Sequence, residues 1–147
     1  VGALSADNDY NGTSFDGSAG SVNIDDIDGD ITVTGTINLD HAKSGVSSGN
    51  LTLSCGGNIK VESALNCNNV NSISLTAGAE NWNYAFVQTL SNVNVGKWTS
   101  NRDVYYIGTG SEAWSGATMT GGGEFVAIDD ESKLPEPPPE GTVFVIR

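Results

Sequence analysis

The sequence has too few histidine, cysteine and basic residues for several common kinds of site. The chain of 147 residues contains one histidine, His41, and two cysteines, Cys55 and Cys67, whereas a structural zinc site normally takes four such ligands. Only 6 residues are Lys or Arg against 18 Asp or Glu, so the formal net charge is -12. That charge argues against nucleic acid or an anionic membrane surface as a partner. No apolar run approaches the ~18 residues of a membrane span, so we expect no membrane insertion.

The sequence also lacks a recognisable catalytic arrangement. Asp40 stands beside His41, but adjacent side chains of a strand point to opposite faces and cannot act as a pair. Gly108, Gly110 and Ala113 have the spacing of a dinucleotide-binding turn. However, no helical pattern follows them to receive a pyrophosphate. We therefore predict that the protein is not an enzyme.

The two cysteines and two glycosylation motifs fit a secreted protein. Cys55 and Cys67 enclose a short loop, which predicts a disulfide, with two unpaired core residues as the alternative. The N-x-[ST] motif occurs at Asn11 and at Asn50, where it permits N-glycosylation. The chain begins at Val1 without a signal peptide. We expect a processed secreted product or an excised piece of a longer protein, located outside the cell or on its surface.

Short apolar runs separated by Gly, Asn, Ser and Asp dominate the chain and predict an all-β protein. Runs such as ITV, INL, LTL, IKV and ISL alternate as strands do, and helical patterns are nearly absent. Ile31, Leu51, Ile73 and Val93 open successive runs that are 20, 22 and 20 residues apart. A repeat of about twenty residues is typical of one coil of a parallel β-solenoid, whose coils must stack to bury a continuous core.

Asparagines between the predicted strands agree with stacked coils. Asn68, Asn69 and Asn71 fit sharp corners, where Asn adopts the left-handed conformation, or side-chain ladders between coils. The stretches GDITVTGTINL, GNLTLSCGGNIKVESALN and SISLTAGA, within residues 29–79, resemble the degenerate repeats of filamentous haemagglutinin-type adhesins. This resemblance implies a right-handed β-helix on a bacterial surface and assigns no binding residue. The alternative fold is a pilin-like β-sandwich completed by a donated strand.

Composition divides the chain into a β body and an unusual tail. We predict an N-terminal extension or cap over 1–20, a β domain over 21–128, an acidic proline-rich linker over 129–141 and a C-terminal strand over 142–147. The strand is apolar on both faces, as strands inside a sheet are. This favours its donation to a neighbouring subunit, with folding back onto its own domain as the alternative. The predicted subunit contacts are Thr142, Val143, Phe144, Val145 and Ile146.

Two acidic stretches are candidates for calcium binding. Asp7, Asp9 and Asn11 alternate before a glycine, which resembles the first half of a calcium loop, although its twelfth position is not Glu. Asp26 and Asp28 belong to a run of four carboxylates that must repel one another or share a cation. A plain turn and a solvated face are the alternatives. Calcium is the one candidate cofactor, and none is required.

Three tryptophans are candidates for stacking on sugar rings. Trp82, Trp98 and Trp114 are each sixteen residues apart, a spacing that could align their faces, and packing in a thin β core is the alternative. Taken together, the sequence predicts a secreted structural subunit that assembles head to tail into an extracellular filament or surface appendage by strand donation. The alternative is a calcium-assisted carbohydrate-binding or adhesin module of a larger surface protein. The expected partners are copies of the chain itself, and glycans in the alternative.

Overall fold

The protein is built from β-strands, as the sequence predicts. The computed structural model describes residues 4–5, 21–26, 28–39, 48–107, 119–139 and 141. Within this part, no helix is long and apolar enough to cross a membrane. The elements in chain order are β1 (Leu4–Ser5), β2 (Val22–Asp26), β3 (Ile31–Val33), β4 (Ile37–Asn38), β5 (Ser48–Cys55), β6 (Ile59–Thr76), β7 (Ala85–Ser100), β8 (Val104–Ile107), β9 (Met119–Thr120), β10 (Phe125–Ile128) and the 3₁₀-helix η1 (Glu131–Lys133).

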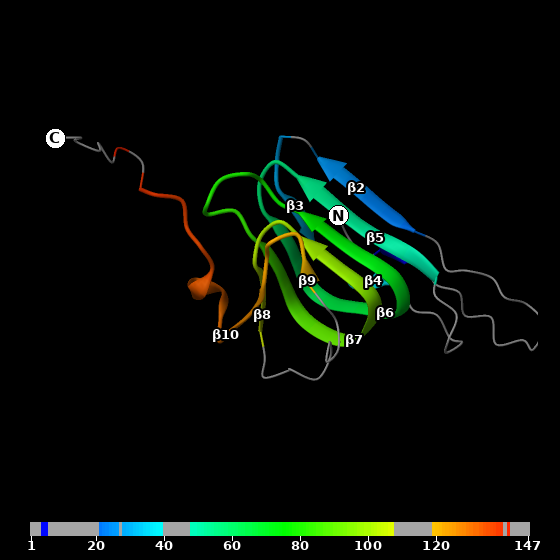
Figure 1. Ribbon diagram of the computed structural model, residues 1–147. Coiled ribbons are helices and arrows are strands. Elements are labelled where there is room, and N and C mark those ends of the chain that lie inside the picture. Colours follow the sequence, from blue (N-terminus) through cyan, green and yellow to red (C-terminus); the bar gives the residue numbers. More distant parts are fainter. Residues whose placement is uncertain are drawn as a thin grey trace, which may run out of the picture.

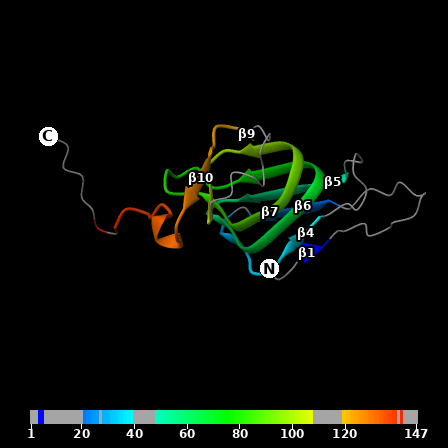
Figure 2. The same cartoon turned by 90° about the horizontal axis from the view of Figure 1, so that it is seen from below.

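The strands pair in parallel and form three columns. The first column contains β2, β5, the end of β6, the end of β7 and β9. The second contains β3, the start of β6, the start of β7, β8 and β10. The third contains β1, β4 and the middle of β6 and of β7. The long strands β6 and β7 bend and so pass through all three columns (Figures 1 and 2).

The register corrects the predicted repeat of twenty residues. Leu51 does pair with Ile73, 22 residues further along the chain. However, Ile31 pairs with Ile59, which is 28 residues away, and not with Leu51. Ile31 and Leu51 belong to different columns, so their spacing does not measure one layer. Turns of unequal length between the columns make the true spacing vary from layer to layer.

Alternating apolar residues build one continuous core between the columns. Strand residues two apart point to the same side, and this places Leu51 and Leu53 inside together with Ile59 and Val61. Parallel in-register pairing then stacks like on like, as Leu51 on Ile73 and Ile73 on Trp98. Each fully buried aliphatic side chain contributes roughly 1.5 to 3 kcal/mol, but only because a neighbouring layer covers it.

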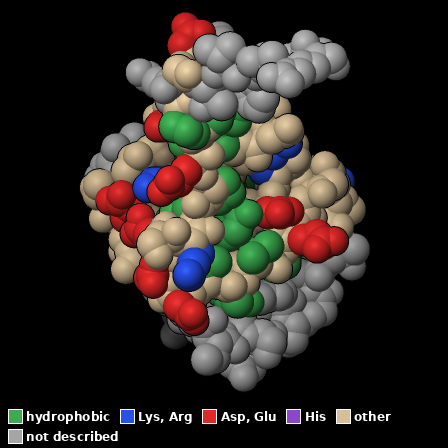
Figure 3. Space-filling model, turned by 90° about the vertical axis from the view of Figure 1, so that its left-hand side faces the viewer, with side chains coloured by type: hydrophobic (Ala, Val, Ile, Leu, Met, Phe, Trp, Pro, Cys, Tyr) green, Lys and Arg blue, Asp and Glu red, His purple; other side chains and the backbone are tan. Residues whose placement is uncertain are grey.

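A second, smaller cluster lies on the outside of the second column. It contains Tyr84, Phe86 and Leu134, and Phe86 is fully buried although its strand neighbours point into the main core. Leu134 follows η1, so the first part of the predicted acidic proline-rich linker, 129–141, packs against the body. Figure 3 shows the hydrophobic side chains gathered along the middle of one face, with acidic side chains around them.

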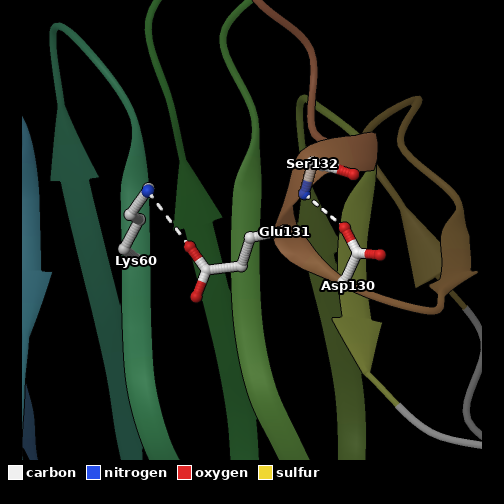
Figure 4. Close-up of polar contacts among 4 residues, drawn as sticks. All are labelled: Lys60, Asp130, Glu131 and Ser132. Carbon is white, nitrogen blue, oxygen red and sulfur yellow. Dashed lines mark hydrogen bonds and ion pairs between the residues drawn. The ribbon is translucent and has the colours of Figure 1, made fainter.

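Polar contacts fasten η1 to this face (Figure 4). The Nζ of Lys60 lies 3.5 Å from Oε2 of Glu131. Partial burial disfavours the charged amine, but Tyr84 and Glu131 together hold the pKa of Lys60 above its ordinary value. At the start of η1, hydrogen bonds from the Ser132 hydroxyl and backbone N–H hold the pKa of Asp130 below its ordinary value. Beyond Leu134 the chain leads away from the body (Figure 1), and residues 136–139 are exposed.

The closest approach of two layers occurs at glycines in the turns between the first and second columns. The N–H of Gly78 donates to the carbonyl oxygen of Gly57 at 2.8 Å. A Cβ atom at Gly78 would overlap the carbonyl of Gly56 and the side-chain amide of Asn83. A Cβ at Gly29 would instead meet the Asp26 carboxylate at 3.2 Å, which can rotate away.

We expect Gly78→Ala to lower the free energy of unfolding by about 1 to 3 kcal/mol, because the backbone of the adjacent layer must move. Gly29→Ala is the matched control and should change it by less than about 0.5 kcal/mol. Urea unfolding followed by circular dichroism measures both. Equal stability of the two variants would contradict the tight stacking at Gly78.

Candidate functional site

One of the three tryptophans predicted to stack on sugar rings, Trp98, is inaccessible to a ligand. Trp98 is completely buried in the core, where its ring meets that of Phe125 edge to face at a centroid distance of 5.1 Å. The prediction was wrong for Trp98 because its position in β7 alternates with outward residues, so it fills the interior. Trp82 lies half-buried in the turn before β7. Trp114 lies outside the described residues.

The predicted calcium ligands are not brought together in the described part of the chain. Asp26 uses Oδ1 to accept a hydrogen bond from the backbone N–H of Asp28 at 3.3 Å, as in a turn. Among the described residues, no three His, Cys, Asp or Glu side chains gather as a metal site would require. Asp7, Asp9 and Asn11 lie outside these residues, as does His41.

Cys55 carries a free thiol, so the predicted disulfide with Cys67 is not present in the structure. The buried thiol of Cys55 donates to the backbone oxygen of Asn58 at 3.4 Å. Burial, together with the nearby charges of Asp30 and Asp26, raises the pKa of this thiol. Two backbone hydrogen bonds lower the pKa, but by less. Cys55 occupies a core position at the end of β5, where the alternative interpretation, an unpaired core residue, is realised. The side chain of Cys67 lies outside the described part.

Asn50 takes part in a side-chain ladder between layers. Its Oδ1 accepts hydrogen bonds from Asn71 Nδ2 at 3.0 Å and from Ser72 Oγ at 2.7 Å. The ladder predicted for Asn71 is therefore confirmed, whereas Asn50 itself was predicted only as a glycosylation position. Asn68, Asn69 and Asn71 lie inside β6 and not in a corner between strands. The predicted subunit contacts, residues 142–146, lie outside the described residues.

A column of mostly polar residues marks the corner just before the second strand column. Each member directly precedes the first residue of a strand in the second column, and these first residues lie in register from layer to layer. The members are Asp30, Asn58, Tyr84, Asp103 and Glu124. We call this set the corner column. Four backbone hydrogen bonds of 2.8 to 3.2 Å join each strand start to the corner residue of the following layer.

Side chains of the corner column add a second set of bonds between layers. Oδ1 of Asp30 accepts the backbone N–H of Asn58 at 2.6 Å, and Oδ1 of Asn58 accepts that of Tyr84 at 3.1 Å. Oδ1 of Asp103 accepts the N–H of Glu124 at 3.0 Å. Such side chains satisfy turn N–H groups that no strand partner reaches. Sequence reasoning missed this role, although a polar residue directly before each apolar run was its signal.

In the part of the chain that the structure describes, the first and second columns end in strands that pair on one side only. Among the described strands, β2 pairs only with β5 and β3 only with β6, at one end of the stack. At the other end, β9 pairs only with β7 and β10 only with β8. An open parallel edge presents alternate N–H and C=O groups that can pair with a further strand.

A polar hollow of about 150 Å³ lies beside the corner column, where successive turns leave a gap. Its walls are Asn81, Asn83, Asn101, Arg102, Asp103, Tyr105, Gly122 and Pro135. These residues come from the turns before β7, β8 and β10, from β8 itself, and from the segment after η1. Most of the polar side chains that line the hollow therefore come from turns, outside the apolar runs from which the strands were predicted.

Asp30→Ala should lower the free energy of unfolding by about 1 kcal/mol, because the N–H of Asn58 loses its acceptor. Asp30→Asn keeps an acceptor oxygen and should stay within about 0.5 kcal/mol of the original protein. Asp129→Ala removes an exposed carboxylate outside the corner column and serves as the control. Urea unfolding at neutral pH measures the free energy of unfolding of the three variants. Equal free energies for all three would show that the Asp30 side chain of the corner column does not stabilise the fold.

Neither the fold nor these sites can be assigned by likeness to other proteins. No protein-family model, curated protein or solved structure matches this chain. Any proposal for the function of the protein therefore rests on the contacts within the molecule.

Proposed function

We propose that the chain is a secreted structural subunit that self-assembles into an extracellular filament or surface appendage. In this proposal the body is a short parallel β-solenoid, in which each layer of the three columns is one coil. The ends of the described columns carry the proposal, because β2 and β3 at one end, and β9 and β10 at the other, each pair with one described strand only. All four strands belong to columns that run in parallel, so a further strand can continue the same pairing at either end.

The course of the chain just before the C-terminal segment supports the proposal that this segment supplies the further strand. Leu134 and the Lys60–Glu131 pair hold the chain on the outer face beside β8 and β10. From this anchor, the exposed prolines lead the chain away from its own body. Polyproline segments extend about 3.1 Å per residue, and their stiffness disfavours an immediate return.

Donation of this segment accounts for its apolar character. Val143 and Val145 alternate with Phe144 and Ile146, so a strand at these positions would bury one pair against a core and the other against a covering element. Burying four such side chains contributes a gross ~6 to 12 kcal/mol, from which the ordering of the tail and the lost freedom of two subunits must be subtracted. One donated and one accepted strand per copy gives a head-to-tail contact, which produces an open filament unless the rotation closes a ring.

We predict that deletion of residues 141–147 yields a soluble, less stable monomer that forms no filaments in negative-stain electron microscopy. Adding a synthetic peptide GTVFVIR should restore the melting temperature of this monomer without restoring filaments, because the peptide is not joined to a second subunit. A peptide of the same composition in scrambled order is the control. Normal filaments from the truncated protein would show that the tail is not the assembling strand.

The full-length protein distinguishes donation of the tail from folding of the tail back onto its own domain. If the tail completes its own domain, the intact chain remains a monomer at all concentrations and its melting temperature does not depend on concentration. Strand donation instead requires that the intact chain assembles and that its melting temperature depends on concentration.

A further inference from the structure

Hydrogen bonds to the preceding turn hold two side chains that line the polar hollow beside the corner column, Asn101 and Arg102. Asn101 is held through both ends of its amide, since Oδ1 accepts the Ala77 N–H at 2.9 Å and Nδ2 donates to the Ala77 oxygen at 2.7 Å. The guanidinium of Arg102 donates through Nε to Gly78 O at 3.1 Å and through Nη2 to Ala79 O. Side chains that are already fixed lose little conformational entropy when a ligand arrives.

Three other residues that line the hollow, Asn81, Asp103 and Tyr105, retain hydrogen-bonding capacity. A carboxylate has two oxygens and about four acceptor positions, so Asp103 can accept further bonds besides the one from Glu124 N–H. Asn81 is exposed and carries an amide with donors and an acceptor. Burial, and then the charge of Asp103, raise the pKa of Tyr105. Its hydroxyl therefore stays protonated at neutral pH and can donate as well as accept.

The composition of the hollow disfavours ionic ligands. A hard cation would find only one carboxylate, Asp103, and would lie beside the positive Arg102. An anion would meet the carboxylate of Asp103 on a chain of net charge -12, while Arg102 already binds two backbone oxygens. A ligand with many neutral groups that both donate and accept fits better, and hydroxyl groups have this property.

A small part of the lining is apolar, and the hollow has a definite size. Tyr105 and Pro135 lie among the polar groups, and the Tyr105 ring is held edge to face by Tyr84 at a centroid distance of 6.1 Å. Aromatic rings pack against apolar C–H faces while their polar end makes hydrogen bonds. The volume of about 150 Å³ is below the roughly 300 to 1,000 Å³ of pockets for drug-sized ligands, so the hollow limits a ligand to about the size of one ring.

We propose that this hollow binds a single ring of a neutral saccharide, with Asn81, Asp103 and Tyr105 hydrogen-bonding its hydroxyl groups. Trp98, which sequence reasoning selected for sugar stacking, is buried in the core and takes no part in it. The saccharide site goes beyond the proposed self-assembly and is independent of it, since the described walls of the hollow lie between residues 81 and 135, outside the tail that is proposed to assemble.

Saturation-transfer difference NMR on the full-length protein tests this site, because the method detects ligands of monomers and of filaments alike. The probes are glucose, galactose, mannose and N-acetylglucosamine, with glucuronic acid as the charged comparison. We expect saturable transfer to the ring protons of at least one neutral sugar at millimolar concentrations. Absence of transfer to all four neutral sugars, or transfer to glucuronic acid alone, would overturn the proposal.

Three variants assign the signal to the hollow. Asn81→Ala and Tyr105→Phe each remove one hydrogen-bonding group and should weaken binding about twofold to tenfold. Asn23→Ala changes an exposed asparagine on β2 and should leave the affinity unchanged. Circular dichroism confirms that the variants fold. If both hollow variants bind the sugar as tightly as the original protein does, the site lies elsewhere and the proposal fails.

Discussion

Stacking of one layer on the next is the interaction on which the rest of this structure depends. The columns are only a few residues wide, so no strand can bury its inward side chains alone. Leu51 is fully buried because Ile73 lies in register beside it, and Ile73 because Trp98 follows. The same stacking leaves the Nε1 of Trp98 buried without a hydrogen-bond partner among the described residues. Such a group costs about 1 to 3 kcal/mol, which the burial of the ring must offset.

The corners control how closely the layers can approach. At Gly57 and Gly78 the turns of successive layers touch through backbone atoms, and a side chain would keep them apart. Asp30, directly after Gly29, and Asn58, directly after Gly57, each accept a backbone N–H of the layer that follows. Close backbone contact and polar side chains at the corner thus act together to set the register of the strands.

The outer face of the second column shows how a segment of low complexity gains a defined place. Phe86 points away from the main core and is buried in the outer cluster. Leu134 covers it, and the ion pair of Lys60 with Glu131 lies at the edge of this contact. A half-exposed ion pair contributes about 0 to 1 kcal/mol, so the apolar contact is the stronger part of the anchor. The acidic, proline-rich composition by itself indicated only an extended linker.

The sequence by itself determined the strands of this protein but not the way they pair. Ile31, Leu51, Ile59 and Ile73 were recognised as strand residues because alternation is a local property, and each lies in a strand and is buried. The pairing of Ile31 with Ile59 was decided by tertiary structure, because the length of each turn sets which strands lie in register. The burial of Trp98, the free thiol of Cys55 and the gathering of Asn81, Asp103 and Tyr105 around one hollow follow from that register. Such outcomes depend on which residues of other layers lie beside them, and a pattern within one segment carries no information about its neighbours in space.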